Sequence, residues 1–322
     1  MPGSLSSRLQ GHYYTVGPRL FGRLSPPPEL PHRVWRRRVT EHGREVVLSG
    51  LLSEPRAAST RANTLVVLLH GCGGKPQSHY TTQLARYLHQ AGHTVLRLAW
   101  RGSDLEGEDF YHASQTADLH AVLSDPELAH HQRVWAIGFS LGGHACLHFA
   151  HESHDARLLK VAAICPVLNL VQTNHFIDSS RATFYRLYTL RGLREGYARA
   201  AARGRTPTDL ASVAQANTFR AYDSLTVVPR YGFASVDDYY TRSCVSRVID
   251  RIERPTLVLS ARHDPMLPWQ IADGMRARFS NAITFRWAER GGHCAFPSDI
   301  ELGLGLGGSG FEEQLHRWLL AD

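Results

Sequence analysis

Residues 138–142 read Gly-Phe-Ser-Leu-Gly and hold the serine of this chain that is best placed for nucleophilic chemistry. The pentapeptide follows the apolar run 134–137 and has the Gly-x-Ser-x-Gly form of a nucleophile elbow, a tight turn that presents a serine hydroxyl at the start of a helix. Gly138 and Gly142 are needed because a Cβ in so tight a turn would collide with a neighbouring strand or helix. Such a pentapeptide also arises by chance, so the prediction that Ser140 is a nucleophile depends on its context.

A serine becomes a useful nucleophile when a histidine takes its proton and a carboxylate holds that histidine in the right tautomer. Asp264 lies just past the apolar run 255–260, and His293 follows another strand-like run at 282–287. The order Ser140, Asp264, His293 is the order of the α/β-hydrolase triad. We therefore predict that Ser140 attacks, that His293 is the general base and that Asp264 orients His293.

The transition state of acyl transfer also needs hydrogen-bond donors for its oxyanion. The apolar run 64–69 leads directly into His-Gly-Cys-Gly-Gly at residues 70–74, a glycine-rich turn that can aim backbone N–H groups at the space above the serine. We expect the backbone amides of Cys72 and Leu141 to form the oxyanion hole. His70 and Gly71 are expected to brace the loop and not to react.

Continuous apolar runs alternate with segments long enough to be helices. The runs lie at 64–69, 94–100, 133–137, 161–167 and 255–260, and the helix-length segments at 78–90, 114–123, 141–151 and 268–279. Continuous apolar runs are typical of strands that are covered on both faces. The alternation predicts an α/β fold, with a mostly parallel central sheet covered by helices on both faces. Alternating residues near 33–40 and 45–52 predict an additional hairpin.

The alternation stops between residues 168 and 247, where the sequence is polar, aromatic and Arg-rich, with helix-compatible pieces at 184–197 and 210–222. An insertion between two core strands is expected to lie over the carboxyl ends of the strands as a largely helical cap, which would select substrates and exclude water. An unrelated small domain is the alternative. The predicted organisation is an N-terminal lead-in (1–32), an α/β-hydrolase core (33–167 and 248–322) and a cap insertion (168–247).

Composition places the chain among ordinary globular proteins, since 43% of its 322 residues are hydrophobic and 20% are charged. No apolar run resembles a signal peptide or a membrane span, so a cytoplasmic protein without a stable membrane anchor is expected. The five cysteines form no Cys-x-x-Cys pair, which favours free thiols. The formal net charge is +7, and the densest basic cluster, Arg33 with Arg36, Arg37 and Arg38, could touch phosphate or anionic lipid. A solvated strand edge is the simpler interpretation, and no nucleic-acid partner is expected.

Several segments together resemble one group within the α/β-hydrolase fold, which includes the bacterial YheT-type hydrolases, the plant EMB8-like proteins and lipid-acting mammalian relatives. The matching segments are 69–80, 100–102, 111–112, 118–119, 138–143, 239–240, 264–265 and 291–296. The resemblance implies a carboxylic-ester hydrolase that acts on acyl chains through an acyl-enzyme on Ser140. The chain departs from the group's usual pattern at His263, where an acidic residue is common, and at Cys72, which lies in a less polar oxyanion loop.

Two rival functions remain open at this stage. An acyltransferase would use the same triad but pass the acyl group to a small alcohol, as some relatives do. A non-enzymatic binding module would keep the fold and use its basic N-terminal cluster to bind nucleic acid. The expected partner of the hydrolase is a small-molecule ester with an apolar acyl chain, and no metal or organic cofactor is expected.

Other motifs have a simpler interpretation than the chemistry they suggest. His144 and His148 have the i, i+4 spacing of a metal pair but lack a His-Glu-x-x-His motif, so a histidine-rich helix without metal is expected. The glycines at 303, 305 and 308 spell a dinucleotide fingerprint but follow no strand-like run. Cys72 and Cys294 lie near predicted site residues, and a buried side chain is a commoner role for each than a reactive thiol.

Overall fold

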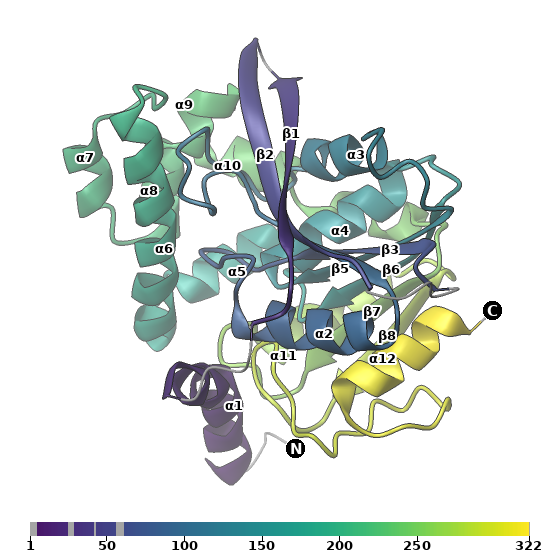
Figure 1. The fold of residues 1–322 in the computed structure, drawn as a ribbon. Helices are drawn as coiled ribbons and strands as arrows, with labels where there is room; N and C mark the ends of the chain where they lie inside the picture. Colours follow the sequence, from purple (N-terminus) through teal and green to yellow (C-terminus); the bar gives the residue numbers. More distant parts are fainter. Residues whose placement is uncertain (1–4, 25–28, 42, 56–60, 322) are drawn as a thin grey trace.

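An eight-stranded sheet forms the centre of the computed structural model, which describes residues 5–24, 29–41, 43–55 and 61–321 (Figure 1). The strand order is β1-β2-β4-β3-β5-β6-β7-β8. The strands are β1 (Arg33–Glu41), β2 (Arg44–Ser53), β3 (Thr64–Leu69), β4 (Thr94–Leu98), β5 (Arg133–Phe139), β6 (Leu158–Ile164), β7 (Thr256–Ala261) and β8 (Ile283–Ala288). The first two strands pair antiparallel with each other and β2 pairs antiparallel with β4, whereas all other pairs are parallel. The predicted α/β fold with a mostly parallel sheet is confirmed.

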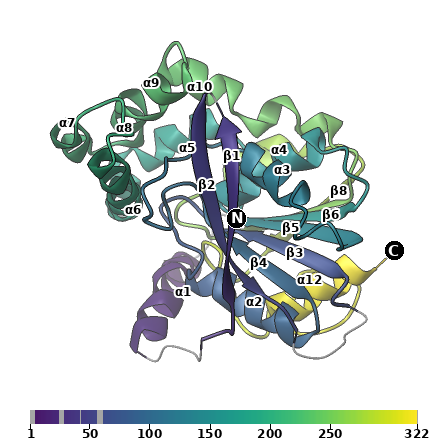
Figure 2. The ribbon, with the colours of Figure 1, turned by 45° about the horizontal axis from the view of Figure 1, so that its top comes forward.

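Helices cover both faces of the sheet. They include α2 (His79–Gln90), α3 (Ala117–Leu123), α4 (Leu141–Glu152), α11 (Trp269–Arg276) and α12 (Gly310–Leu320). Apolar residues of α3, α4 and α11 pack in one buried cluster with the sheet, and those of α2 and α12 pack in a second cluster. Figure 2 shows α3 and α4 on one side of the sheet and α2 and α12 on the other. Every residue of β3, β4 and β7 is buried, because both faces of these strands are covered.

The predicted strand at 161–167 differs from the observed β6, which begins at Leu158 and ends at Ile164. Pro166 has no backbone N–H with which to extend the ladder. Cys165, the residue before it, has a positive φ of 45° and turns the chain away from the sheet. The apolar character of residues 165–167 therefore serves packing at the end of the strand and not the strand itself.

Helix α1 (Leu5–Leu24), which the sequence analysis did not predict, lies in the segment expected to be an N-terminal lead-in. It contains Pro18, which argues against a helix interior when the sequence is considered alone. Val16 packs against a buried cluster formed by Ile177, Ala182 and Tyr185, so tertiary contacts support the helix. Figures 1 and 2 both place α1 next to the N-terminal part of the inserted helices.

Six α-helices fill the interval between β6 and β7. They are α5 (Leu170–Ile177), α6 (Thr183–Ala202), α7 (Leu210–Gln215), α8 (Phe219–Leu225), α9 (Val227–Tyr231) and α10 (Val236–Arg242), accompanied by short 3-10 turns at Ser180–Ala182, Val245–Arg247 and Ile249–Arg251. The segment 210–222 forms two helices because Thr218 begins a new one, accepting a hydrogen bond from the Ala221 N–H at 3.1 Å. The inserted helices have a buried cluster of their own, which includes Leu190, Tyr197 and Tyr222.

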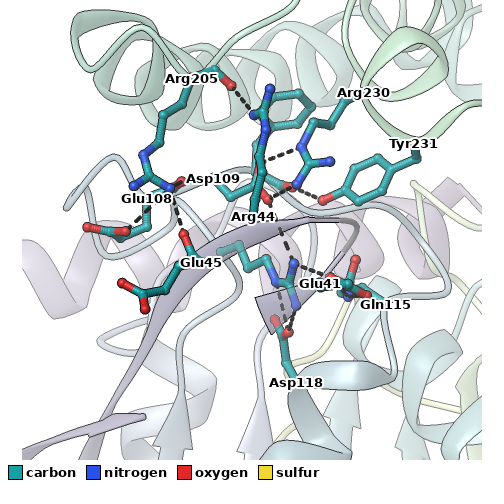
Figure 3. Close-up of polar contacts among 12 residues, drawn as sticks. Glu41, Arg44, Glu45, Glu108, Asp109, Gln115, Asp118, Arg205, Arg230 and Tyr231 are labelled. Carbon is teal, nitrogen blue, oxygen red and sulfur yellow. Dashed lines mark hydrogen bonds and ion pairs between the residues drawn. The ribbon is translucent and has the colours of Figure 1, made fainter. Parts of the chain in front are cut away.

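Buried ion pairs lie within the core and between the core and the inserted helices. The Arg101 guanidinium, on the loop after β4, pairs with Asp118 of α3 at 2.6 Å and also with Glu41 at the end of β1. Asp109 receives two hydrogen bonds from Arg230 of α9, at 3.0 and 2.6 Å. Figure 3 shows Asp109 between the hairpin of β1 and β2 and the inserted helices above it, whereas Asp118 lies below the hairpin. The Asp109–Arg230 pair therefore links the insertion to the core through charged groups that are out of water.

Candidate active site

The elbow around Ser140 is a strained turn between β5 and α4. Ser140 has φ 54° and ψ −118°, a combination that residues with a side chain rarely adopt. A Cβ added at Gly138 would lie 2.1 Å from the Gly142 carbonyl oxygen, and one added at Gly142 would lie 2.4 Å from the Leu69 carbonyl oxygen. The turn therefore has no room for a side chain at either flanking glycine. This agrees with the steric reason that the sequence analysis gave for Gly138 and Gly142.

Asp264 and His293 form a hydrogen-bonded pair. His293 Nδ1 lies 2.7 Å from Asp264 Oδ2, and the other carboxylate oxygen accepts hydrogen bonds from the backbone N–H groups of Met266 at 2.8 Å and Leu267 at 3.0 Å. The bond to Asp264 places the hydrogen of a neutral imidazole on Nδ1 and leaves Nε2 as an acceptor. Burial acts to lower the pKa of His293, but the Asp264 carboxylate outweighs it, and the pKa of His293 is raised.

Four of the five residues predicted to form the triad and the oxyanion hole line the same cavity. Ser140, His293, Cys72 and Leu141 all line it, whereas Asp264 lies behind His293 with its side chain 2% exposed. Among the described residues, no hydrogen bond joins the Ser140 hydroxyl to His293. Catalytic hydrogen bonds are often long in the absence of substrate and tighten when it binds.

The glycine-rich loop after β3 presents one backbone amide to this cavity. The Gly71 N–H donates to the Tyr80 hydroxyl at 2.9 Å, and the Gly73 N–H donates to the Tyr111 hydroxyl at 2.8 Å. These two bonds fix the loop on either side of Cys72, whose own amide pairs with no described residue. The Leu141 amide opens α4, where the first N–H groups of a helix have no intrahelical acceptor. Cys72 and Leu141 both line the cavity, so their amides are candidates for binding an oxyanion.

His70 and Cys72 are both held in their neutral forms. His70 Nε2 lies 2.9 Å from the Ser103 hydroxyl, and the Trp100 indole N–H donates to the His70 carbonyl oxygen at 2.8 Å. Burial lowers the pKa of His70 to about 4 and raises the pKa of the Cys72 thiol to about 12. A neutral imidazole in these contacts can brace the loop, and a protonated thiol is a poor nucleophile.

Thr15 of α1 is a site residue that sequence reasoning missed. The His293 backbone N–H donates to Thr15 Oγ1 at 2.9 Å, and the Thr15 hydroxyl donates to the Gly11 carbonyl oxygen at 2.7 Å. A Cβ added at Gly11 would lie 1.9 Å from the carbonyl oxygen of His263, the neighbour of Asp264 in the chain. Helix α1 therefore lies against both loops that carry the Asp264–His293 pair. No motif signals this contact, because 278 positions separate its partners.

Replacing Thr15 by valine is expected to lower kcat about tenfold, because a small displacement of a catalytic group can cost up to about 10²-fold. Thr15→Ser keeps the hydroxyl and should restore most of the rate. Leu9→Ala, at an exposed position of the same helix, is the matched control. Steady-state kinetics and the pH profile of kcat/KM measure the effect. A displaced His293 should change the acid limb of that profile, whereas an equal loss in Thr15→Val and Leu9→Ala would contradict a positioning role.

The histidines of α4 do not offer a metal pair. The two ring nitrogens of His144 lie 2.6 Å and 2.7 Å from the carbonyl oxygens of Val167 and Ser243, and His148 Nε2 also contacts the Ser243 oxygen at 3.0 Å. Across the described ranges, donor atoms that could hold a soft cation converge at Cys165, His293 and Cys294, within 4.8 Å of one another. A cation there would occupy the imidazole that Ser140 requires.

The structure also places the other features that the sequence analysis considered. The glycines at 303, 305 and 308 lie in the loop before α12 and do not directly follow a strand, as the sequence indicated. Among the aromatic residues of the inserted helices, Phe219, Tyr222 and Tyr239 line the cavity, whereas Phe184 is 62% exposed. Arg33 pairs with Glu54 and Glu127, and Arg38 pairs with Glu45, so carboxylates already neutralise much of the basic cluster. Within the described residues, no helix is long and apolar enough to cross a membrane.

Comparison with known proteins gives matches over most of the chain. The sequence model of the alpha/beta hydrolase fold family matches residues 64–299. The Escherichia coli (strain K12) protein named "Putative esterase YheT" is 28% identical over 294 residues, which are 88% of this chain and 84% of that protein. The "Medium-chain fatty acid ethyl ester synthase/esterase 2" of Saccharomyces cerevisiae is 24% identical over 267 residues, or 72% of this chain and 58% of that protein. A solved esterase structure from Pyrococcus furiosus superposes with a TM-score of 0.52 and 17% identity, covering 82% and 84% of the two chains.

Proposed function

The chain belongs to the alpha/beta hydrolase fold family, and from that membership we propose that it is a serine hydrolase that cleaves carboxylic esters. The resemblance to YheT-type and EMB8-like proteins is confirmed by the relatives that the chain matches. Family membership and esterase-named relatives support a hydrolase. The nucleophile, the ester substrate and the role of residues 168–247 as a substrate-selecting cap are parts of our proposal.

In the proposed reaction, His293 Nε2 takes the proton of the Ser140 hydroxyl while Oγ attacks the ester carbonyl carbon. The amides of Cys72 and Leu141 donate to the oxyanion of the tetrahedral intermediate. His293 then gives its proton to the departing alkoxide, which leaves an acyl-enzyme on Ser140. Water attacks this ester with His293 again as base, and the acid is released. Asp264 holds the ring and stabilises its protonated form.

The observation that carries this proposal is the Asp264–His293 pair at 2.7 Å, with His293 on the same cavity as a serine in a strained elbow. The cavity also indicates the kind of ester. Its wall is largely apolar, and includes Val167, Leu170, Ile177, Leu193, Phe219 and Val227. An apolar acyl chain fits such a wall, because burying it removes apolar surface from water.

Labelling with a fluorophosphonate probe tests the proposal directly, because the probe reacts covalently with an activated serine. The wild-type protein should be labelled and Ser140→Ala should not. Ser124→Ala, at an exposed position after α3, should label as the wild type does. Failure of the wild type to react, or equal labelling of Ser140→Ala, would overturn the proposed nucleophile.

Acyl transfer is a second candidate, favoured by the name of the yeast relative, which joins a synthase to an esterase. An alcohol in place of water would attack the same acyl-enzyme and yield a new ester. Product analysis separates the two reactions. A hydrolase releases mainly the free acid when ethanol is added, whereas a transferase accumulates the ethyl ester.

A further inference from the structure

Asp223 of α8 places a buried carboxyl group on the wall of the otherwise largely apolar cavity. The residue is 8% exposed and lines the same cavity as Ser140 and His293. The Tyr240 hydroxyl donates to its Oδ2 at 2.8 Å. Within the described residues, Oδ1 has no hydrogen-bond partner. One oxygen is therefore held by the protein, and the other is left for whatever enters the cavity.

No cationic side chain of the described residues forms an ion pair with Asp223. This sets it apart from Asp109 and Asp118, which are also buried but bind Arg230 and Arg101. Burial raises the pKa of Asp223 to about 7, against the opposing effect of the Tyr240 hydrogen bond. A buried carboxyl group without a cation is costly unless hydrogen bonds satisfy it.

Thr173 of α5 adds a second unsatisfied group to the same cavity. The residue is 7% exposed and lines the cavity, and its buried hydroxyl has no hydrogen-bond partner among the described residues. Helices α5 and α8 pack against each other, so both groups belong to the same part of the insertion. Unsatisfied buried polar groups are uncommon in folded proteins, and a ligand that completes their hydrogen bonds is one explanation for them.

We propose that Asp223 and Thr173 form a polar subsite for a hydroxyl group of the substrate, so that the preferred ester is a hydroxylated one and not a plain alkyl ester. A hydroxyl group suits both residues, since it can donate to Asp223 Oδ1 and accept from the Thr173 hydroxyl. An alkyl chain would leave both groups buried and unpaired. This inference rests on the proposed function, because it assigns the substrate of the same Ser140 site.

Two matched substrate series test the inference. The first compares p-nitrophenyl hexanoate with analogues that carry a hydroxyl group at successive positions of the acyl chain, and the second compares butyl hexanoate with its hydroxybutyl analogues. Above pH 7, where Asp223 is mainly ionised, the wild type should show kcat/KM at least about tenfold higher for one hydroxylated analogue than for the plain ester, as expected for a hydrogen bond to a charged group. A plain ester that equals or exceeds every hydroxylated analogue in both series would overturn the inference. Analogues that carry an amino group in place of the hydroxyl group complete each series. A preference for an amino analogue over every hydroxylated one would overturn the inference as well, because it would indicate a subsite for a cation.

Three variants test whether Asp223 causes the preference for hydroxylated esters. Asp223→Leu should lose the preference and hydrolyse the plain ester at least as well as the hydroxylated one, because the wall becomes apolar. Asp223→Asn keeps an acceptor and should retain part of the preference. Tyr240→Phe is the control: it removes the bond to Oδ2 but leaves the carboxyl group, so the preference should persist. Loss of the preference in Tyr240→Phe but not in Asp223→Leu would contradict the assignment.

Fluorophosphonate labelling distinguishes failure of this inference from failure of the proposed function. A wild-type protein that is labelled and hydrolyses plain esters without a hydroxyl preference refutes only the subsite. Absence of both labelling and hydrolysis refutes the serine hydrolase itself. The comparison of substrates on the wild type needs no variant to fold, so a destabilised Asp223→Leu does not remove the test.

Discussion

Asp264→Asn is expected to lower kcat by about 10⁴-fold, the size of effect that the same change has in a Ser-His-Asp triad. The reason lies in the two oxygens of Asp264. Oδ1 accepts from the Met266 and Leu267 amides, so an asparagine would keep its carbonyl oxygen there and turn its NH₂ group towards His293. The ring would then accept at Nδ1 and carry its hydrogen on Nε2, the nitrogen that must take the proton of Ser140.

The pH profile provides a second readout of the same change. The Asp264 carboxylate outweighs burial and raises the pKa of His293 in the wild type. Catalysis needs the neutral ring, so kcat/KM should fall as the pH drops through this pKa. Asp264→Asn removes the carboxylate but leaves the burial, and the acid limb should move to lower pH.

Asp273→Asn, at an exposed position of α11, is the matched control and should leave rate and profile unchanged. Kinetics with a p-nitrophenyl ester over a range of pH measure both effects. A loss smaller than tenfold in Asp264→Asn would show that another group orients His293.

The loops that carry Cys72, Ser140 and Asp264 could be located from sequence because each follows a strand that is largely buried on both faces. The loop of His293 follows β8, whose residues are mostly half-buried. The apolar runs that become β3, β5 and β7 are continuous, and the ends of parallel strands meet at one edge of the sheet. Ser140 and Asp264 follow two of these runs directly. The local sequence was therefore enough to predict both the strand and the residue that the strand positions.

Contacts between distant segments could not be predicted in this way. Helix α1 depends on packing against residues of α5 and α6, and its bond from Thr15 to His293 has no local pattern. Asp223 likewise lies among polar and aromatic residues of α8 that resemble an ordinary surface helix in sequence. Its importance comes from the cavity that α5 and α8 close, which depends on how the inserted helices pack.

Arg101→Met is expected to lower the free energy of unfolding by about 3–5 kcal/mol, because removing one partner of a buried ion pair leaves the other charge uncompensated. The Arg101 side chain is 1% exposed and that of Asp118 is 3% exposed. The guanidinium donates to Asp118 Oδ1 from Nε at 2.8 Å and from Nη2 at 2.6 Å, and it also pairs with Glu41. A methionine fills a similar volume but satisfies neither carboxylate.

Two comparisons separate charge from packing. Arg38→Met breaks an exposed pair with Glu45, in which the arginine side chain is 68% exposed, and should cost at most about 1 kcal/mol. The double variant Arg101→Met, Asp118→Leu removes both buried charges and should recover part of the stability lost in the single variant. Urea unfolding followed by circular dichroism gives the free energy of unfolding of each of the three variants relative to the wild type. If Arg101→Met were as stable as Arg38→Met, the buried pairs of Arg101 with Asp118 and Glu41 would contribute no more to the free energy of unfolding than a surface pair does.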